Sequence, residues 1–591
     1  MGLISPRLPD LDPEEWAARP RLGRIKPMDQ DWAEGGFGTP DAVLVLYVVK
    51  LGLYAFGAAA VTAATPGIGS LGDIGDWWTQ PIFFQKVVVF TLLFEILGLG
   101  CGFGPLTLRF LPPVGAPLHW LRPGTIRLPP WPDRVPLTHG TRRSVVDVLL
   151  YAGVVASAVW LLVSPGQGPG SALGAGVGTI EAARFVPLLA CLGVLGLRDK
   201  TPFLAARSEV YGTLAIICLF SGADLIIGAK LVFLLIWWGA ATSKLNQHFP
   251  HVVAVMMSNS PVLRSKRLKR RFHRDFPEDL RPSKVSEHLA HGGTVVELTV
   301  PLVLLLSNGG LLTTAAAVVM ICFHLQILTS LPMGVPLEWN VFMMFGIGFL
   351  FVHHADVSVL DMQHPVPVLA IVAAAASIVV LGNLFPRQFS FLPAMRYYAG
   401  NWATSLWCLT PSAVEKLDAS VPKVARLPQA QLETLYGEEV AGLLSGKVHA
   451  FRAMHTHGRA LLSLVPRACG ADHETAYAVH DGEFVAGIAL GWNFGDGHLH
   501  GEQLLSALQE RCGFEPGEVR VVHLESQRFW DPRQEYRLLD GATGELERGF
   551  VKVADLLERQ PWDGDLPTYG VVTTASPIPS PTSSTEPNAE V

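Results

Sequence analysis

The sequence predicts an α-helical polytopic membrane bundle of about ten spans, followed by a small mixed α/β cytosolic domain. Two observations carry this prediction. Hydrophobic residues make up 49% of the 591-residue chain and charged residues only 16%, whereas an ordinary soluble domain carries roughly 25% charged residues. Charge is also sparse from residue 42 to 386 and of ordinary density from residue 411 onward. The two regions are therefore expected to fold in different solvents.

Apolar runs of roughly 17–25 residues are long enough to cross a bilayer as helices. The predicted spans, some of them shorter than this, are 42–64, 82–104, 144–163, 182–197, 209–222, 225–243, 292–307, 311–330, 336–353 and 367–385. For the fourth, fifth and seventh, a tilted, broken or re-entrant helix is an open alternative. Residues 1–40 are polar and contain no apolar core of a signal peptide, so insertion is expected to use the internal spans.

Lysine and arginine are confined to alternate loops. They occur in the N-terminal arm, in the 105–143 loop, among Arg198, Lys200 and Arg207, and above all in the 245–291 loop. The intervening loops Ser164–Gly178, Gly222–Asp224, Ser307–Gly310 and His353–Val366 contain none. By the positive-inside rule, the chain is expected to be a multi-pass protein of the cell membrane with both termini cytoplasmic.

Five segments are predicted along the chain. They are a cytoplasmic N-terminal arm (1–41), a transmembrane domain (42–386) with a basic cytoplasmic loop (245–291), an interfacial segment rich in aromatic residues (387–410), a soluble C-terminal α/β domain (411–570) and a disordered tail (571–591). In the C-terminal domain, Tyr477–Trp492 alternates like two strands with a turn at Asp481-Gly482, Glu502–Arg511 is amphipathic, and Val519–Leu524 and Tyr536–Leu539 are typical of strands.

Ionisable residues inside the predicted spans are the most informative feature. A charge in hydrocarbon costs at least ~2.5–3.5 kcal/mol, so such residues usually pair or line a cavity. The set comprises Lys50, Lys86, Glu95, Asp147, Lys230, Lys244, Glu297, His324 and Glu338. Counting from the cytoplasmic ends of the spans places most of them in the cytoplasmic half of the membrane. Two interpretations stay open: a polar pocket facing the cytoplasm, or structural ion pairs such as Lys50 with Glu95.

The segment from Trp237 to Asn246, WWGAATSKLN, resembles the signature of the vitamin K-dependent carboxylase-like superfamily, which includes the horizontally transferred transmembrane domain. Glu297 with Pro301, and His324 in the following helix, are similar to later motifs of that superfamily, and the resemblance covers roughly residues 200–385. The whole chain, including MRYYAGNW at 395–402, also resembles an actinobacterial family of polytopic transmembrane proteins that carries a domain of unknown function.

The superfamily resemblance implies catalytic roles for three residues. In the carboxylases the signature lysine is the base that begins quinol oxygenation, and this role falls on Lys244. Glu297 and His324 are then expected to be its proton partners or orienting groups. The chain departs from the signature at Ala241, where the family has glycine, and at 247–250, where QHFP replaces the expected tryptophan.

Histidine pairs provide the other candidate sites. His248 and His251 form one HxxH pair and His288 and His291 a second, but a di-iron centre is disfavoured because His353 lies at the opposite membrane face. The HxH pairs 455/457 and 498/500 are interpreted as surface histidines rather than zinc ligands. We therefore predict no metal site, and no cofactor is identified.

We expect a membrane enzyme that acts on a lipid or quinone-like substrate. A transporter or lipid-handling protein, and a membrane scaffold with a cytosolic docking domain, are the alternatives. Membrane lipids and an isoprenoid quinone are the expected partners; the net charge of −6 does not suggest nucleic acid. Anionic headgroups are expected to bind the basic run of Arg264, Lys266, Arg267, Lys269, Arg270 and Arg271.

Overall fold

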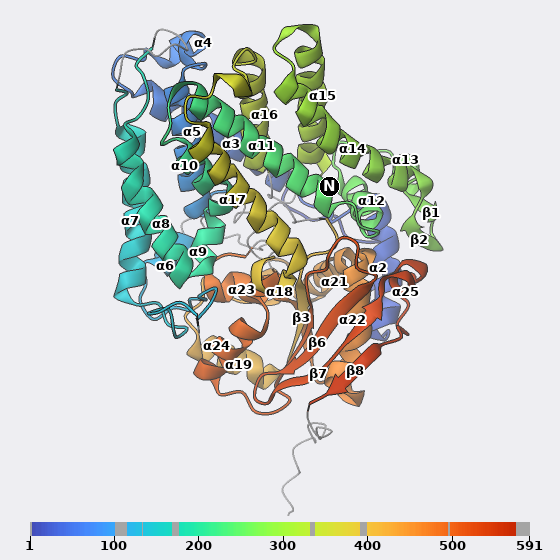
Figure 1. Cartoon of the computed structure of the whole chain (residues 1–591). Coiled ribbons are helices and arrows are strands. Elements are labelled where there is room, and N and C mark those ends of the chain that lie inside the picture. Colours follow the sequence, from blue (N-terminus) through green and yellow to red (C-terminus); the bar gives the residue numbers. More distant parts are fainter. Residues whose placement is uncertain are drawn as a thin grey trace, which may run out of the picture.

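The chain folds into a helical half and a sheet-containing half, which are stacked end to end (Figure 1). The structure is a computed structural model that describes residues 3–100, 115–132, 134–167, 176–330, 337–390, 399–493 and 497–574. The predicted interfacial residues 391–398 and the tail from residue 575 lie outside the described residues.

Among the residues that the structure describes, six helices are long and apolar enough to cross a membrane. They are α3 (Asp41–Ala63), α7 (Val145–Val163), α11 (Gly222–Ser243), α14 (Lys284–Leu306), α15 (Gly310–Ser330) and α17 (Pro365–Leu384). A seventh span results if α5 (Pro81–Ile96) is joined to the short helices η1 (Leu71–Asp73) and α4 (Ile74–Trp77), from which it is bent by 118°. The structure thus confirms an integral membrane bundle with six candidate spans, and the number ten stays a prediction.

The remaining predicted spans coincide with shorter helices. These are α8 (Phe185–Arg198), η4 (Ser208–Gly212) with α10 (Thr213–Ile217), and α16 (Leu337–Gly346) with η5 (Ile347–His353). At a rise of ~1.5 Å per residue, the 14-residue α8 is shorter than the ~30 Å hydrocarbon core. They pack against the longer helices, α8 on α7, η4 on α5 and α16 on α3.

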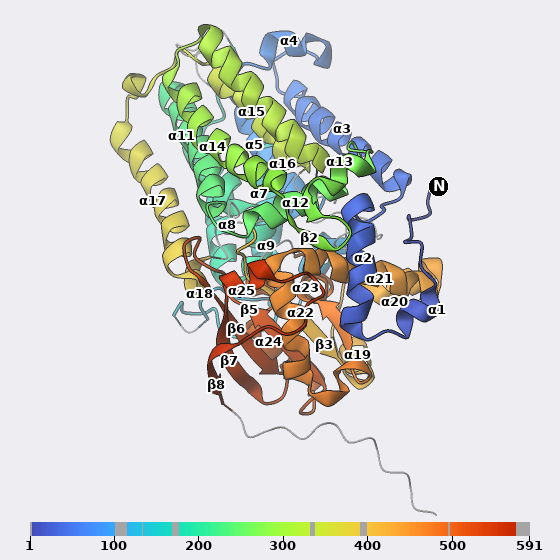
Figure 2. The same cartoon turned by 90° about the vertical axis from the view of Figure 1, so that its right-hand side faces the viewer.

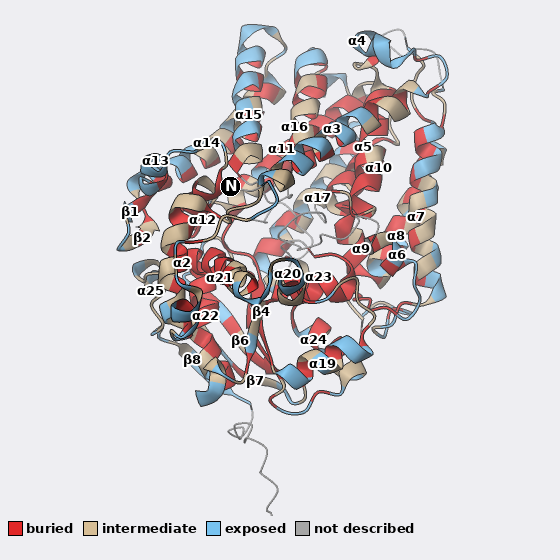
Figure 3. Ribbon diagram, turned by 180° about the vertical axis from the view of Figure 1, so that it is seen from behind, coloured by how far each residue is buried: buried red, intermediate tan, exposed pale blue. Residues whose placement is uncertain are grey.

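Helix α11 is the centre of the bundle. Two-thirds of its most apolar window (67%) is buried, whereas only 17% of the corresponding window of α17 is buried. Figure 3 shows the contrast between buried inner helices and the exposed residues along α7 and at the free end of α15. The residues that flank the end of α11, including Lys244, are therefore held against several neighbouring helices.

Short elements lie between the longer helices, and several of them contact the other half. They are α1 (Pro13–Ala17), α2 (Arg21–Gly35), α6 (Gly115–Trp120), η3 (Ala182–Arg184), α9 (Lys200–Ala205), α12 (Phe249–Asn259), α13 (Lys266–Arg270), the antiparallel pair β1 (His273–Asp275) and β2 (Asp279–Pro282), η6 (Val359–Asp361) and α18 (Pro386–Phe389). Helix α2 lies beside α21 and α12 (Figure 2).

The second half contains a six-stranded antiparallel sheet in the order β4-β3-β5-β6-β7-β8. Its strands are β3 (Thr404–Leu409), β4 (Ala478–Asp481), β5 (Val519–Leu524), β6 (Arg533–Asp540), β7 (Gly544–Lys552) and β8 (Tyr569–Thr573). Its helices are α19 (Pro411–Ser420), α20 (Pro428–Tyr436), α21 (Glu438–Met454), α22 (Thr456–Cys469), η8 (Ala471–Glu474), α23 (Gly482–Leu490), η9 (Gly497–Leu499), α24 (Glu502–Cys512) and α25 (Val553–Glu558).

The central strands β3 and β5 are buried on both faces. Trp407 and Val521 face one hydrophobic cluster, which includes residues of α23 and α24, while Leu406 and Val522 face a second cluster with α22. This alternation is the period of two expected for strands. Trp407, expected in the headgroup layer, is therefore a core residue with 1% exposure.

Most secondary-structure predictions for this half are confirmed, and one is wrong. The strands at Val519–Leu524 and Tyr536–Leu539 and the helix at Glu502–Arg511 are present. The alternating stretch from Tyr477 to Trp492 forms a strand only to Asp481, after which Gly482–Leu490 is the helix α23. The Asp481 side chain accepts a hydrogen bond from the backbone N–H of Glu483 at 2.9 Å and so caps the helix.

The segments predicted to share one side of the membrane all contact the C-terminal half. Arg21 of the arm donates to His473 O at 2.8 Å, and Thr141 to Glu510 at 2.6 Å. Lys200 donates to His498 O at 3.1 Å, and the 245–291 loop reaches Glu558 O through Arg281 at 2.9 Å. The arm, three basic loops and the sheet-containing half thus lie at one end of the bundle (Figure 1).

Candidate functional site

Lys244 and Glu297 form an ion pair at the end of α11. Helix α11 ends at Ser243, and Lys244 follows as its C-cap residue. The Nζ atom of Lys244 lies 2.6 Å from each carboxylate oxygen of Glu297, which is on α14. The two side chains are 14% and 4% exposed, so the pair is largely but not completely shielded.

Aromatic rings and exposed apolar side chains lie close to this ion pair. The Lys244 ammonium lies 5.4 Å from the ring centre of Phe249 and 5.9 Å from that of Phe323, within the range of cation–π attraction. Nearby Leu245 and Val295 are 51% and 56% exposed. The pair therefore lies just beneath a part of the bundle surface that is apolar.

His324 lies beside the ion pair, and both of its ring nitrogens have hydrogen-bond partners. The indole N–H of Trp237 donates to Nε2 at 3.0 Å, so Nε2 carries no proton. Nδ1 therefore carries the proton and donates it to Oδ1 of Asn340 at 2.8 Å. This arrangement fixes a neutral imidazole. Trp237 and Asn340 are members of the site that sequence reasoning missed, although Trp237 stands in the quoted signature.

Lys50 and Glu338 form a second buried pair. Nζ of Lys50 lies 3.0 Å from Oε2 of Glu338 and donates to Gly100 O at 2.7 Å. Glu338 and Asn340 are both on α16, so this helix connects the second pair to His324. Glu95 is fully buried on α5. Lys50 forms its ion pair with Glu338, and the pairing of Lys50 with Glu95, named above as an example, stays a prediction.

Asp147 belongs to a separate network at the start of α7. It accepts from Ser144 N at 2.7 Å in a capping box, and its other oxygen accepts from Arg198 at 2.6 Å. Arg143 forms a further buried pair with Asp199 at 2.8 Å. These contacts fix the junction of α7 and α8, and they give Asp147 a structural role in helix capping.

The basic run is largely exposed, but some of its members are occupied. Lys266 lies 2.8 Å from Glu34 of α2, and Arg270 pairs with the same carboxylate. Lys269 is buried and donates to Ser258 O at 2.6 Å. Arg264, Arg267 and Arg271 remain exposed. Three of the six predicted headgroup ligands therefore have protein partners, and two of the three share Glu34 of the N-terminal arm.

A buried group of histidines lies where the two halves meet, and sequence reasoning placed part of it wrongly on the surface. His455 and His457 are each 1% exposed, and the ring centre of Trp402 lies 5.9 and 4.5 Å from theirs. His248 on the same side bridges to Thr456 and Gln527, both at 2.6 Å. Burial lowers the pKa of His248 to about 4. The sequence features that mark this group are the HxxH spacing of His248 and His251 and the HxH spacing of His455 and His457, which lie on two separate segments.

Two further buried groups belong to this layer. Asp29 of α2 is fully buried, neither carboxylate oxygen has a hydrogen-bond partner, and burial raises its pKa well above the usual range. Both ring nitrogens of His251 are also buried without a partner. The HxxH pair 288/291 is exposed on α14, away from this layer. Among the described residues, no three His, Cys, Asp or Glu side chains are arranged to hold a metal ion.

Comparison with known proteins places the chain by its family. No curated protein and no solved structure matches it. The carboxylase-like resemblance and the actinobacterial origin therefore stay predictions. A family model described as "Transmembrane protein of unknown function (DUF3556)" matches residues 1–571. The chain therefore belongs to the DUF3556 family of transmembrane proteins.

Proposed function

We propose that the protein is a membrane-embedded enzyme that acts on a lipid or isoprenoid-quinone-like substrate, with Lys244 and Glu297 as its proton-transferring pair. One observation carries the proposal: an ion pair with two 2.6 Å contacts lies under an apolar surface and between aromatic rings. Ionisable residues at membrane depth are expensive and are functional by default. The rings offer a surface that suits a planar apolar headgroup.

The pair supplies acid–base chemistry. Because the Lys244 Nζ atom donates to both carboxylate oxygens of Glu297 at 2.6 Å, a proton of Lys244 can pass directly to Glu297 and leave a neutral amine. That amine then accepts a proton from a hydroxyl group of the substrate, and Glu297 holds the first proton until the product needs it. His324 touches Trp237 and Asn340 and acts as a positioning residue. The departures at Ala241 and 247–250 leave carboxylation outside the proposal.

The test begins with the compounds that co-purify with the wild-type protein, identified by mass spectrometry of lipid extracts. A quinone or lipid enriched over the bulk membrane is then reconstituted with the protein in nanodiscs, and its conversion is followed by mass. Lys244→Ala is expected to slow conversion by about 10²–10⁴-fold, the usual contribution of general acid–base catalysis. Lys244→Arg is not expected to rescue, because arginine keeps its proton.

Lys230→Met is the matched control, because Lys230 is a buried lysine of the same helix that donates to His354 O and Val357 O at 2.8 and 2.7 Å. A folded Lys230→Met variant should keep the wild-type rate. A folded Lys244→Ala variant that converts the enriched compound at the wild-type rate would refute the proposal.

A second candidate, a membrane scaffold with a docking domain, is favoured by the buried pairs remote from Lys244. Lys50 with Glu338, and Asp147 with Arg198, have the geometry of structural ion pairs. A scaffold would enrich no compound, and its Lys244→Ala variant would retain every cellular phenotype of the wild type.

We also propose that the end carrying the C-terminal half faces the cytoplasm, because it gathers the basic loops. Arg267→Cys at this end and Leu311→Cys at the opposite end, where Leu311 is 87% exposed, make a matched pair in a Cys322→Ser background. A membrane-impermeant maleimide should label position 311 in intact cells, and position 267 only after permeabilisation. The reverse pattern would overturn the orientation.

A further inference from the structure

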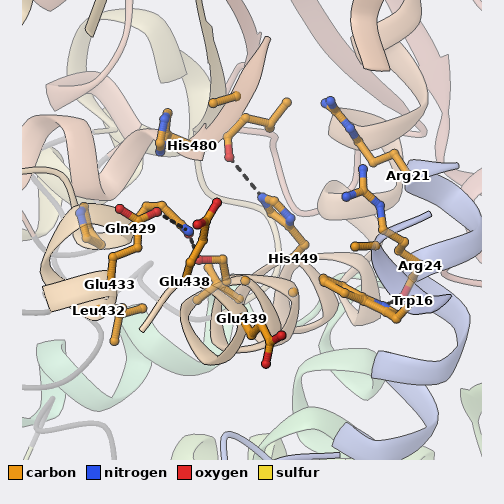
Figure 4. A pocket seen from close by; sticks show the side chains of 18 of the residues that line it. Trp16, Arg21, Arg24, Gln429, Leu432, Glu433, Glu438, Glu439, His449 and His480 are labelled. Carbon is orange, nitrogen blue, oxygen red and sulfur yellow. Dashed lines mark hydrogen bonds between the residues drawn. The ribbon is translucent and has the colours of Figure 1, made fainter. Parts of the chain in front are cut away.

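A cavity of about 540 Å³ lies between the N-terminal arm and the C-terminal half, remote from Lys244. Its walls come from α1 and α2 on one side and from α20, α21 and β4 on the other (Figure 4). This volume is within the ~300–1,000 Å³ range of small-molecule sites. Neither the family description nor the membrane chemistry proposed above uses this cavity.

One wall is cationic. Arg21 and Arg24 lie one turn apart on α2, and Figure 4 shows both guanidinium groups on the same side of the cavity. Arg21 is only 9% exposed; its Nη2 donates to His473 O at 2.8 Å, but its Nη1 is buried without a hydrogen-bond partner. A buried guanidinium nitrogen without a partner is costly, and an anionic ligand would satisfy it.

The two arginines have little negative charge to balance them. Glu474 accepts from the backbone N–H of Arg21 at 3.0 Å and lies 3.5 Å from Arg24. Burial lowers the pKa of Arg24, and the neighbouring charge of Arg21 lowers it further. Two cations thus share one carboxylate, which leaves a net positive wall.

The opposite wall is acidic and the floor is neutral. Glu433 and Glu438 carry their carboxylates on the α20–α21 side, whereas Glu439 points away from the cavity (Figure 4). His449 and His480 lie between the two charged walls. Burial lowers the pKa of both histidines to about 4, so they are neutral hydrogen-bonding groups at pH 7.

Trp16 completes the cavity with an apolar surface. Its indole N–H donates to Arg24 O at 3.0 Å, and its ring sits on Gly446 of α21, where an added Cβ would approach the ring to 2.7 Å. The ring is therefore held by the arm and by the C-terminal half together. Any molecule bound here would contact both.

We propose that this cavity binds a small dipolar metabolite, with its carboxylate or phosphate on Arg21 and Arg24 and its ammonium group toward Glu433 and Glu438. A carboxylate zwitterion of dipeptide size and an aminoalkyl phosphate share this chemistry. The bound molecule ties the arm to α21 and stabilises their contact. This inference does not depend on the proposed membrane chemistry.

Calorimetric titration of the full-length detergent-solubilised protein tests the site with four probes. They are alanyl-leucine, phosphoethanolamine, inorganic phosphate as an anion alone and spermidine as a cation alone. One of the two dipolar probes is expected to bind at least about tenfold more tightly than phosphate or spermidine, because it satisfies both walls. Which dipolar probe binds identifies the anionic group.

Variants locate the binding. Arg24→Gln is expected to lower the affinity for the dipolar probe by about tenfold or more, and Glu438→Gln is expected to lower it by a smaller factor. Glu415→Gln, at an exposed carboxylate of α19 outside the cavity lining, is the control and should change nothing. Glu438 is exposed, so its variant stays informative if Arg24→Gln fails to fold. Equal or tighter binding of phosphate or spermidine, or no saturable binding of any probe, would overturn the proposal.

Discussion

Two buried lysines of the membrane half have hydrogen-bond partners within the protein, whereas two buried titratable groups of the junction beneath it do not. In the membrane half, Lys50 pairs with Glu338 at 3.0 Å, and Lys230 donates to two backbone carbonyls at 2.8 and 2.7 Å. At the junction, Asp29 and His251 are buried with carboxylate oxygens and ring nitrogens that have no hydrogen-bond partner in the protein.

Solvent explains this difference. Hydrocarbon offers no hydrogen bonds, so a buried charge there needs a partner within the protein. The junction borders water, and ordered water molecules complete such groups in most proteins. The Lys244–Glu297 pair lies between these two regimes, because it is fully paired and its lysine is still 14% exposed. An accessible pair suits chemistry, and an enclosed pair suits structure.

The largest expected effect comes from breaking the enclosed pair. Lys50→Met removes the ammonium that lies 3.0 Å from the buried Glu338 carboxylate, and removal of one partner of a buried ion pair typically costs about 3–5 kcal/mol. The free energy of unfolding of the variant should fall by that amount. Thermal denaturation in detergent, followed by tryptophan fluorescence, measures it.

The double variant Lys50→Met with Glu338→Leu sharpens the comparison. Replacement of both charges by apolar groups removes the desolvation cost, so the double variant should recover most of the lost stability. If Lys50→Met alone is as stable as the wild type, Glu338 has other compensation and the pair is not what holds α3 against α16.

The sequence anticipated parts of this arrangement through residue chemistry. Lys244 and Glu297 were expected to act together, and they lie 2.6 Å apart. Individual residues could be identified because a charged residue within an apolar run can be found from the sequence alone. The pairing of Lys50 with Glu338 could not be predicted, because it depends on which helices become neighbours. Helix α16 lies close to α3 only in the folded bundle.

The same limit explains the two errors of the C-terminal half. A period-two pattern cannot exclude a buried helix, so Gly482–Leu490 was read as a strand although Asp481 is a helix cap. His455 and His457 were read as surface residues because their surroundings come from distant parts of the chain: His248, which contacts Thr456 between them, is 208 positions earlier. The cavity beside Trp16 likewise needs two distant segments and had no signal in either alone.

A smaller effect tests the junction through pH. Burial lowers the pKa of His455 to about 3, from an ordinary value near 6.5. In the unfolded chain His455 is protonated below about pH 6.5, whereas in the folded protein it stays neutral down to about pH 3. The free energy of unfolding therefore falls as the pH decreases through this window. Between pH 7 and pH 5 this one residue should lower the free energy of unfolding by about 2 kcal/mol.

His455→Asn, whose amide can replace the Nδ1–H donor to Phe451 O, should reduce the pH-dependent loss by that amount in parallel melts at the two pH values. An unchanged pH dependence in this variant would mean that water already reaches His455 and solvates its charge, and the proposed contrast with the membrane half would then lie elsewhere in the junction.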